Sequence, residues 1–265
     1  MAWIDLEGAV NVRDLGGLPT EDGGAIRPGR LLRGDNLQDL SPADIARLVG
    51  DVGLTTVVDL RSTAELRAEG PAPLDVLPDV RHVHCPVLPE QGAATDVVAD
   101  VLLTRDDADR SRYPADPRAG HYLGYLEDRP EQVAAAVRAV VTAPGAALVH
   151  CAAGKDRTGV VVALALSAVG ARPDAVATDY AATGERLDLL LDRLRRSPTY
   201  AGDVDSKPAA AHRPQAATMV AFLDQLTARY GGAAEWLACH GFSPGDVARL
   251  QAKLRRAGPP PRPAT

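Results

Sequence analysis

Aromatic residues, cysteines and long apolar runs are all scarce in this sequence of 265 residues. Phe, Trp and Tyr make up 4% of the chain, although hydrophobic residues in total reach 46%, which is enough for a packed core. The three cysteines, at positions 85, 151 and 239, are odd in number and widely spaced. This spacing excludes a disulfide framework and the ligand pattern of a zinc site, so a reducing compartment is expected.

An excess of positive charge is also lacking, because 29 Lys and Arg face 35 Asp and Glu and the formal net charge is -6. Such a chain has no general attraction for nucleic acid or an anionic membrane, so any anion site must be local. No apolar run reaches about 18 residues, so no membrane span is expected. Asp5 and Glu7 stand where a secretory signal needs positive charge. We expect a cytoplasmic protein, with export by a signal-independent route left open.

The order of the predicted elements indicates an α/β fold. Apolar, β-branched runs predict strands, and apolar residues at helical spacing predict helices. A strand, a glycine-containing loop and a helix follow one another near residue 150, which is typical of a sheet with its ligand site at the carboxyl ends of the strands. The predicted strands cover 29–34, 55–60, 80–87 and 147–151, the predicted helices 41–49, 62–70, 91–103, 130–141 and 158–170, and a surface loop 104–120.

Beyond residue 172 every predicted element is a helix. No linker divides the chain, so residues 1–258 are expected to form a single domain with a helical extension over about 172–256. Residues 259–265, rich in proline, are expected to form a disordered tail. The helices of the extension are predicted at 173–183, 185–195, 214–229, 232–240 and 243–256.

Residues 150–159, HCAAGKDRTG, combine a thiol, a carboxylate and two cations in one turn. Cys151 lies where a buried strand ends and Thr158 begins a helix, so free backbone N–H groups at the helix start form a concave anion site. Gly154 permits the backbone conformation that this cradle needs. The planar guanidinium of Arg157 matches two oxygens of a phosphate. The loop therefore predicts a phosphate site.

The same positive environment acts on the thiol of Cys151. A free cysteine titrates near ~8.5, so only a few per cent is thiolate at neutral pH. Helix N-termini and nearby cations lower that value to ~3.5–7.5. An attacking atom and fixed positive charge over a transferring phosphoryl group are thus both present.

The pattern His150-Cys151, five residues, Arg157-Thr158 resembles the signature loop of the cysteine-dependent tyrosine phosphatase superfamily. The GKDRTG ending, NVRDLGG (11–17), GRLLRGDNL (29–37) and VVDLRS (57–62) resemble the bacterial tyrosine/serine and phosphoinositide phosphatase family. The likeness runs from about residue 8 to about residue 256. It implies a central, mostly parallel sheet flanked by helices, with a helical C-terminal extension that forms a lid over the cleft in some members.

The resemblance also implies a role for each residue of the loop. Cys151 attacks phosphorus and forms a phosphocysteine, Arg157 binds phosphate and stabilises the transition state, and the Thr158 hydroxyl helps the sulfur leave. His150 orders the loop, and neither a metal nor another cofactor is expected. The resemblance further implies that Ala152, Ala153, Gly154 and Lys155 bind phosphate and that Asp59, Arg13 and Asp14 support the loop. A surface ion pair is an equally good interpretation of Arg13 and Asp14.

The proton donor to the leaving group has three candidates. Asp156, inside the loop, is favoured by the resemblance; its alternative role is an ion pair with Lys155 or a neighbouring arginine. Asp59 ends a strand that would bring it to the same sheet edge, and its alternative is an ion pair with Arg13 or Arg61. Asp116, in YPADP, is the positional analogue of a conventional acid loop. Geometry has to decide among them.

Other polar residues have weaker functional interpretations. Lys155 either suits substrates with more than one phosphate or merely offsets Asp156. His82 and His84 alternate on a strand but lack a third metal ligand, so a structural role is expected. Cys85 and Cys239 are expected to be small buried or half-buried hydrophobic side chains. Four residues of the helical extension either touch substrate from the lid or have only ordinary packing, with their charges solvated on the outer face: Tyr180, Arg186, Arg195 and Arg196.

The function that these residues favour is a phosphomonoester hydrolase, chiefly a protein-tyrosine(/serine) phosphatase with phosphoinositide activity. Its partners would be a phosphorylated protein, a phosphoinositide or a small phosphate ester. Alternatives are a phosphatase of a small biosynthetic ester and a phosphate-binding module without strong catalysis. A sulfurtransferase does not require Arg157-Thr158, and Asp156 occupies the hydroxyl position of a nucleotide-binding P-loop, so both are disfavoured.

Overall fold

A six-stranded sheet forms the centre of the computed structural model, which describes residues 1–88, 116–205, 208–256 and 258. Its strand order is β1-β2-β4-β7-β5-β6. Four neighbouring strands are parallel, whereas β1 and β2 join one edge in antiparallel register. The predicted mostly parallel α/β sheet is confirmed. The strands are β1 (Ala2–Trp3), β2 (Arg13–Asp14), β4 (Leu31–Gly34), β7 (Ala146–His150), β5 (Leu54–Asp59) and β6 (Arg81–His84).

Alternate side chains of the central strands enter two separate apolar cores, because successive residues of a strand point to opposite faces. The larger core lies under α5, α6 and α7, and the smaller one lies under α1, η1 and η2. Val58 and Val149 enter the larger core, whereas Val57 and Leu148 enter the smaller. The helices of the two faces are α5 (Pro117–Asp128), α6 (Pro130–Thr142) and α7 (Asp156–Ala168) on one, and α1 (Pro42–Ala46), η1 (Arg47–Asp51) and η2 (Pro73–Val76) on the other.

Helix α2 (Thr63–Glu69) directly follows the carboxyl end of β5. Its first turn is closed by a capping box, in which Ser62 accepts from the N–H of Glu65 and the Glu65 carboxylate accepts from the N–H of Ser62. Gly70 ends the helix with a φ of 74°, as its position predicted. The box fixes the orientation of Glu65 at the edge of the sheet where the strands end.

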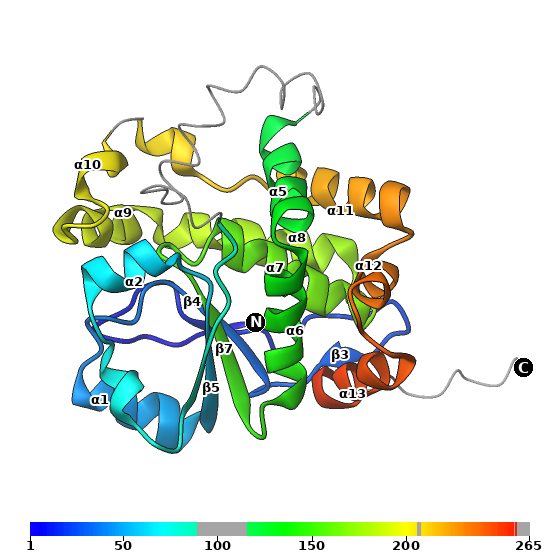
Figure 1. The fold of residues 1–265 in the computed structure, drawn as a ribbon, viewed down its shortest axis with the longest axis horizontal. Helices are drawn as coiled ribbons and strands as arrows, with labels where there is room; N and C mark the ends of the chain where they lie inside the picture. The colour runs from blue at the N-terminus through cyan, green and yellow to red at the C-terminus, as the bar shows by residue number, and fades with distance from the viewer. Residues whose placement is uncertain (89–115, 206–207, 257, 259–265) are drawn as a thin grey trace, which may run out of the picture.

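The C-terminal half is a set of helices that covers one side and the upper edge of the sheet (Figure 1). It returns at its end to the N-terminal region, because β8 (Arg255–Arg256) pairs antiparallel with β3 (Ala25–Ile26). The helical elements are α8 (Pro173–Ala182), η3 (Thr183–Arg186), α9 (Leu187–Arg196), α10 (Ala201–Val204), η4 (Ala209–His212), α11 (Ala216–Tyr230), α12 (Ala233–Cys239) and α13 (Pro244–Leu254).

Two element predictions are wrong. The loop expected over 104–120 ends earlier, because Asp116 caps α5 and Pro117 occupies its first position, a start signal that the proline-rich composition concealed. The last two residues of the helix expected over 243–256 instead form β8, where they complete the backbone hydrogen bonds of β3. The helix expected at 91–103 and the tail at 259–265 lie outside the described residues.

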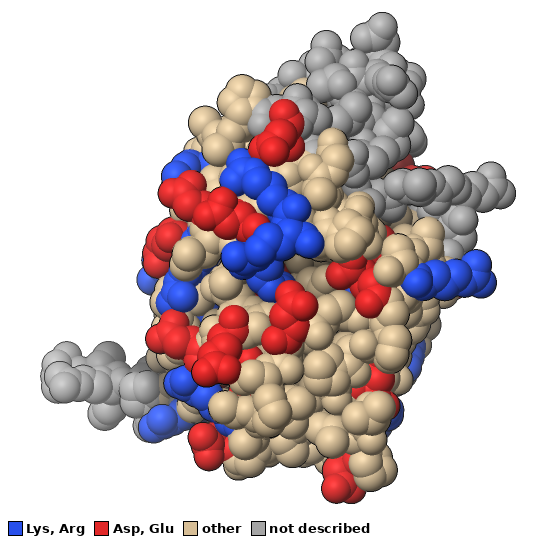
Figure 2. Space-filling view, turned by 90° about the vertical axis from the view of Figure 1, so that its left-hand side faces the viewer, with Lys and Arg blue, Asp and Glu red and all other residues tan. Residues whose placement is uncertain are grey.

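Charged side chains of both signs intermingle on the face that carries α9 and α10 (Figure 2). Arg195 pairs there with Asp192 and Asp205, and Arg186 pairs with Asp5. Within the described ranges, no helix is long and apolar enough to cross a membrane.

Candidate active site

The loop 150–156 lies at the carboxyl edge of the parallel strands, between the ends of β4 and β5. His150 ends β7 and is paired in register with Gly34 of β4 and with Asp59 of β5. Helix α7 begins at Asp156. The sheet therefore brings three strand ends around the loop, as the predicted topology requires.

The carbonyl groups of the loop are bound from within the protein. Arg33 donates from Nη2 to the oxygens of Gly154 at 2.7 Å and Lys155 at 3.2 Å. The Asn11 amide donates to the oxygen of Ala153 at 2.9 Å, and the N–H of Asn36 donates to that of Ala152 at 2.9 Å. In a planar trans peptide the N–H points opposite to the C=O. The N–H groups that follow these carbonyl groups along the chain therefore point away from Arg33, Asn11 and Asn36.

Arg33 is held by a buried network of charges. Asp179 of α8 pairs with Arg33 at 2.7 Å and with Arg13 at 2.8 Å, and all three side chains are buried. Burial by itself would raise the pKa of Asp179, but the two guanidinium groups outweigh it and hold that pKa below its usual value. Removing one partner of such a pair typically costs about 3–5 kcal/mol. Arg13 thus supports the loop through Asp179, whereas the Asp14 carboxylate binds the N–H groups of Gly16 and Gly29.

Gly154 is required at its position for two reasons. Its φ of 65° lies in the left-handed region, and a Cβ atom would stand 2.3 Å from the carbonyl oxygen of Gly34. The loop can therefore pack against the end of β4 only with glycine here.

Arg157 is fixed by two hydrogen bonds to one carboxylate. Its Nη1 and Nη2 atoms donate to the two Glu65 oxygens at 2.7 and 2.9 Å. Tyr200, which follows α9, donates to the same carboxylate at 3.1 Å. Burial opposes ionisation of Glu65, but Arg157 and the capping hydrogen bonds outweigh it and hold the pKa of Glu65 below its usual value. The Glu65 carboxylate thus fixes the plane of the Arg157 guanidinium.

Asp156 is buried and has three polar neighbours. Its carboxylate pairs with Lys155 at 3.2 Å and accepts a short hydrogen bond from Tyr122 of α5. Burial raises the pKa of Asp156, whereas Lys155, Arg118 and the Tyr122 hydroxyl lower it, and the net result is a pKa below the usual value. Lys155 also donates to the carbonyl oxygen of His212 at 3.1 Å. The ion pair weighed as the alternative role of Asp156 is present.

The other two carboxylates have different partners. Asp59 binds Arg61 through both oxygens and lies 3.5 Å from His150 Nε2, so Arg61 rather than Arg13 is its partner. Burial is the main cause that lowers the pKa of His150 to about 4, so this ring is neutral at pH 7. Asp116 accepts from two N–H groups at the start of α5, which is a helix cap.

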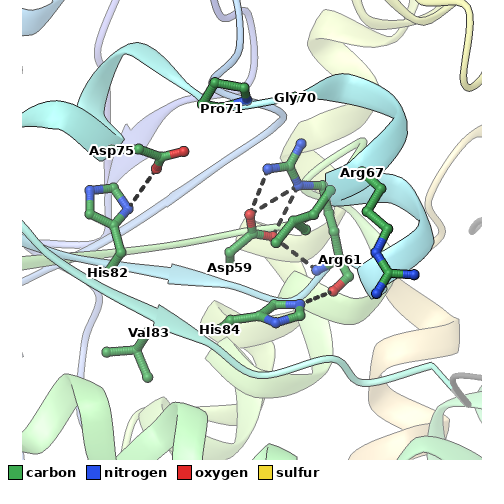
Figure 3. Close-up of a pocket in the computed structure, with 10 residues that line it drawn as sticks. Asp59, Arg61, Arg67, Gly70, Pro71, Asp75, His82, Val83 and His84 are labelled. Carbon is green, nitrogen blue, oxygen red and sulfur yellow. Dashed lines mark hydrogen bonds and ion pairs between the residues drawn. The ribbon is translucent and has the colours of Figure 1, made fainter.

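A pocket of about 380 Å³ beside Asp59 is lined by residues of α2, of β6 and of the segment 70–75 between them (Figure 3). His82 faces Asp75 at 3.0 Å, and His84 Nε2 lies 2.8 Å from the carbonyl oxygen of Arg61. Across the part of the chain that the structure describes, no three His, Cys, Asp or Glu side chains gather as a metal site. Both histidines contact neighbouring protein groups, in agreement with the structural role expected for them.

Cys151 and Thr158 are both completely buried at the base of the loop. The Thr158 hydroxyl makes no hydrogen bond with any described residue, so it is available to a group that enters the loop. Cys85 is also buried, and burial raises its pKa to about 11, which makes it a poor nucleophile at pH 7. Cys239 is exposed at the end of α12, contrary to the expectation of burial.

The helical extension packs directly on the loop. Ala152 and Ala153 share an apolar cluster with Leu191 and Leu194 of α9 and with Tyr200. Arg186 and Arg195 form surface ion pairs instead of facing the loop, which agrees with the solvated alternative for these two residues. Arg196 is exposed, whereas Tyr180 is buried.

Several residues that hold the site were not singled out in the sequence. Each is buried and polar, and the tertiary structure brings each to the loop or to an arginine or carboxylate that supports it. Two of them had a weak local signal: Arg33 lies within an apolar strand, and Glu65 stands three residues after the capping Ser62. The full set comprises Asn11, Arg33, Glu65, Tyr122, Asp179 and Tyr200.

Cys151 directly after β7 and, six positions later, Arg157 in the first turn of α7 form the strand-to-helix arrangement of the cysteine-dependent phosphatases. This is the class that the fold and the site define. A family model described as the tyrosine phosphatase family matches residues 4–256, and the chain belongs to that family. It is therefore a tyrosine phosphatase-type phosphomonoesterase, as the signature loop predicted.

Three curated relatives agree with this assignment. The chain is 36% identical to the triple specificity protein phosphatase PtpB of Mycobacterium tuberculosis over 213 residues, which are 73% of this chain and 74% of that protein. It is 35% identical to a Cupriavidus necator protein named as a tyrosine-protein phosphatase, over 66% of this chain and 61% of that protein. It is 32% identical to a tyrosine-protein phosphatase of Nostoc commune, over 52% of this chain and 48% of that protein. The chain thus covers less than two thirds of the last two relatives.

Proposed function

We propose that this protein hydrolyses phosphomonoesters of tyrosine and serine in proteins, and of phosphoinositides, through a phosphocysteine at Cys151. The observation that carries the proposal is the loop itself: its carbonyl groups are bound by Arg33, Asn11 and Asn36, so its N–H groups are preorganised for a phosphate. A relative named for triple specificity supports action on more than one class of phosphoester.

The reaction proceeds in two displacements at phosphorus. The Cys151 thiolate forms the S–P bond while the bond to the leaving oxygen breaks, and that oxygen takes a proton from an acid. Water then attacks phosphorus and gives a proton to the carboxylate that donated one in the first step, and the S–P bond breaks with the electron pair returning to sulfur. Arg157 and the loop N–H groups stabilise the charge on the equatorial oxygens in both steps. The Thr158 hydroxyl stabilises the departing thiolate.

We propose Asp156 as the proton donor, although burial, which raises its pKa, is outweighed by Lys155, Arg118 and Tyr122, which leave that pKa below the usual value. A phosphate dianion in the loop competes with Asp156 for Lys155 and adds negative charge beside the carboxyl group. Both changes raise the pKa of Asp156 and favour its protonated form. Asp59 is less suited to this role because Arg61 binds both of its oxygens, and Asp116 is engaged as a helix cap.

Replacing each of the three aspartates by asparagine should separate their roles. For Asp156→Asn we expect kcat to fall about 10²–10⁴-fold with a poor leaving group and much less with a good one, because only the poor one needs a proton. Asp59→Asn and Asp116→Asn should change both rates by similar factors. Equal losses on the two substrates for Asp156→Asn would contradict its role as the acid.

A phosphate-release screen tests the substrate classes directly. We expect release from phosphotyrosine peptides, phosphoserine peptides and phosphoinositides in the presence of EDTA. Lys155, which places a positive charge within the loop, should favour esters with a second phosphate, so Lys155→Met should lower kcat/KM more for a bisphosphate than for a phosphotyrosine peptide. The alternative, a small biosynthetic ester, would appear as activity confined to that class.

We also propose that the single domain 1–258 uses its extension, about 172–256, as a lid. The closed position is supported by the apolar contacts of α9 with Ala152 and Ala153 and by the hydrogen bond from Lys155 to His212. The cysteine usage supports a cytoplasmic location.

Clamping this lid should slow chemical access to Cys151. The expected result of a disulfide between α2 and the Ser197–Tyr200 turn is slower alkylation of Cys151 when oxidised than when reduced, because the reagent must pass α9. Alkylation at equal rates in both states would contradict a lid and leave the extension as ordinary packing.

A further inference from the structure

Two tyrosines from different helices form a chain of hydroxyl groups that ends on Asp156. Tyr122 of α5 donates to Asp156 Oδ1, and the hydroxyl oxygens of Tyr122 and Tyr180 are 2.6 Å apart. A tyrosine has one proton to donate. Since Tyr122 uses its proton on the carboxylate, the proton between the two phenols comes from Tyr180 of α8.

The side chains packed around the two phenol rings hold them in this arrangement. Both rings are buried, and the Tyr122 ring meets Tyr180 and Phe222 edge-on, each with a centroid distance of 6.1 Å. The Tyr180 ring lies against α7 at Gly159, where a Cβ atom would come within 3.0 Å of its Cδ2 atom. The last glycine of HCAAGKDRTG therefore provides the space in which Tyr180 reaches Tyr122.

We propose that Tyr122, supported by Tyr180 and seated on Gly159, is a positioning residue that sets the location and proton affinity of Asp156. Only the kinetic effect expected of this contact rests on the proposed role of Asp156 as the acid. The hydrogen bond to the carboxylate exists in the structure whatever Asp156 does.

The direction of the effect follows from the groups around Asp156. A donated hydrogen bond stabilises the ionised carboxylate, as do the charges of Lys155 and of Arg118 on α5. Burial acts in the opposite direction. When substrate draws Lys155 toward phosphate, Tyr122 is the contact that keeps the carboxyl group oriented. Its loss should make Asp156 easier to protonate and less well placed.

The experiment is a carboxyl ¹³C NMR titration of Asp156 with inorganic phosphate kept saturating, the resonance being assigned by its loss in Asp156→Asn. Tyr122→Phe is expected to raise the midpoint by about one pH unit, in line with a hydrogen bond to a charged group. Tyr180→Phe should raise it by less. Tyr125→Phe, which removes a hydroxyl from the same helix, is the control and should leave it unchanged. A Tyr122→Phe midpoint equal to that of the unmodified protein would overturn the proposal.

The kinetic measurement separates this inference from the proposed function. With a poor leaving group, the alkaline limb of the pH profile of kcat, which reports the substrate-bound enzyme, should move to higher pH in Tyr122→Phe by the same amount, while its plateau falls. A merely structural role would lower the plateau and leave the limb in place. If Tyr122→Phe shifts the NMR midpoint but the alkaline limb of the pH profile persists in Asp156→Asn, Asp156 is not the acid. The positioning of Asp156 by Tyr122 would still hold.

A second variant covers failure of Tyr122→Phe to fold. Gly159→Ala keeps every hydroxyl group and favours the helical state of α7. Its methyl group displaces the Tyr180 ring, so the Asp156 midpoint is expected to rise by a smaller amount than in Tyr122→Phe. An unchanged midpoint in both Gly159→Ala and Tyr180→Phe would also overturn the proposal.

Discussion

Replacing Cys151 by serine is expected to lower kcat by at least about 10⁴-fold, as the loss of a covalent nucleophile does in other enzymes. A serine hydroxyl is far less acidic than a thiol, so almost none of it is in the anionic, nucleophilic form near neutral pH. The change is nearly isosteric, so the loop N–H groups and Arg157 should still bind phosphate. Phosphate release and the affinity for an inorganic oxyanion, measured on the same preparation, separate the two effects.

The matched control is Cys239→Ser, because Cys239 is exposed on α12. Its activity should equal that of the unmodified protein. Release that survives in Cys151→Ser, or that disappears with EDTA in the unmodified protein, would contradict a mechanism through phosphocysteine.

Replacing Arg157 by lysine should lower kcat/KM by about 10²–10³-fold, the range found when one preorganised donor is removed from a charge-stabilising site. Lysine keeps the positive charge but loses the planar fork that binds both Glu65 oxygens at 2.7 and 2.9 Å. Lysine is also preferable to alanine here, because removing the charge altogether leaves Glu65 buried and unpaired at a cost of about 3–5 kcal/mol. Full steady-state kinetics and a denaturant curve distinguish lost catalysis from lost folding.

The ion pair of Glu65 with Arg157 should make the stability of the protein depend on pH. Its pKa is lowered in the folded protein, so its contribution to stability is complete above the unfolded value of about 4.3 and is lost as pH falls through the lower folded value. Glu65→Gln should therefore flatten the acid side of the curve of unfolding free energy against pH.

An Arg157→Lys protein that retains activity within about tenfold would contradict the bidentate role assigned to this arginine.

The sequence predicted much of the fold and the loop because those features are local. Apolar runs marked β5 and β7, and Ser41 and Ser243 marked helix starts that the structure confirms as capping boxes. The signature loop predicted the class, since its residues are contiguous. The start of α5 was missed because Asp116 and Pro117 are as common in loops as at helix starts.

The supports of the loop escaped prediction because they come together only in three dimensions. Asp179 lies 146 positions from Arg33 along the chain, and Tyr122 lies 34 positions from Asp156. Neither residue belongs to a local motif, and a polar residue on a helix is usually solvated. Their burial next to the loop, not their residue type, is what identifies them as part of the site.

The pairing of β3 with β8 also affects how the protein can be made. Arg27 donates to the carbonyl oxygen of Arg255, 228 positions away, and β3 lies close in sequence to the Arg13 that supports the loop. During synthesis on the ribosome, β3 has to wait until residues 255–256 have emerged before it can pair with β8. Contacts of such separation slow folding. The pairing of β3 with β8 is therefore expected to be a late step of folding.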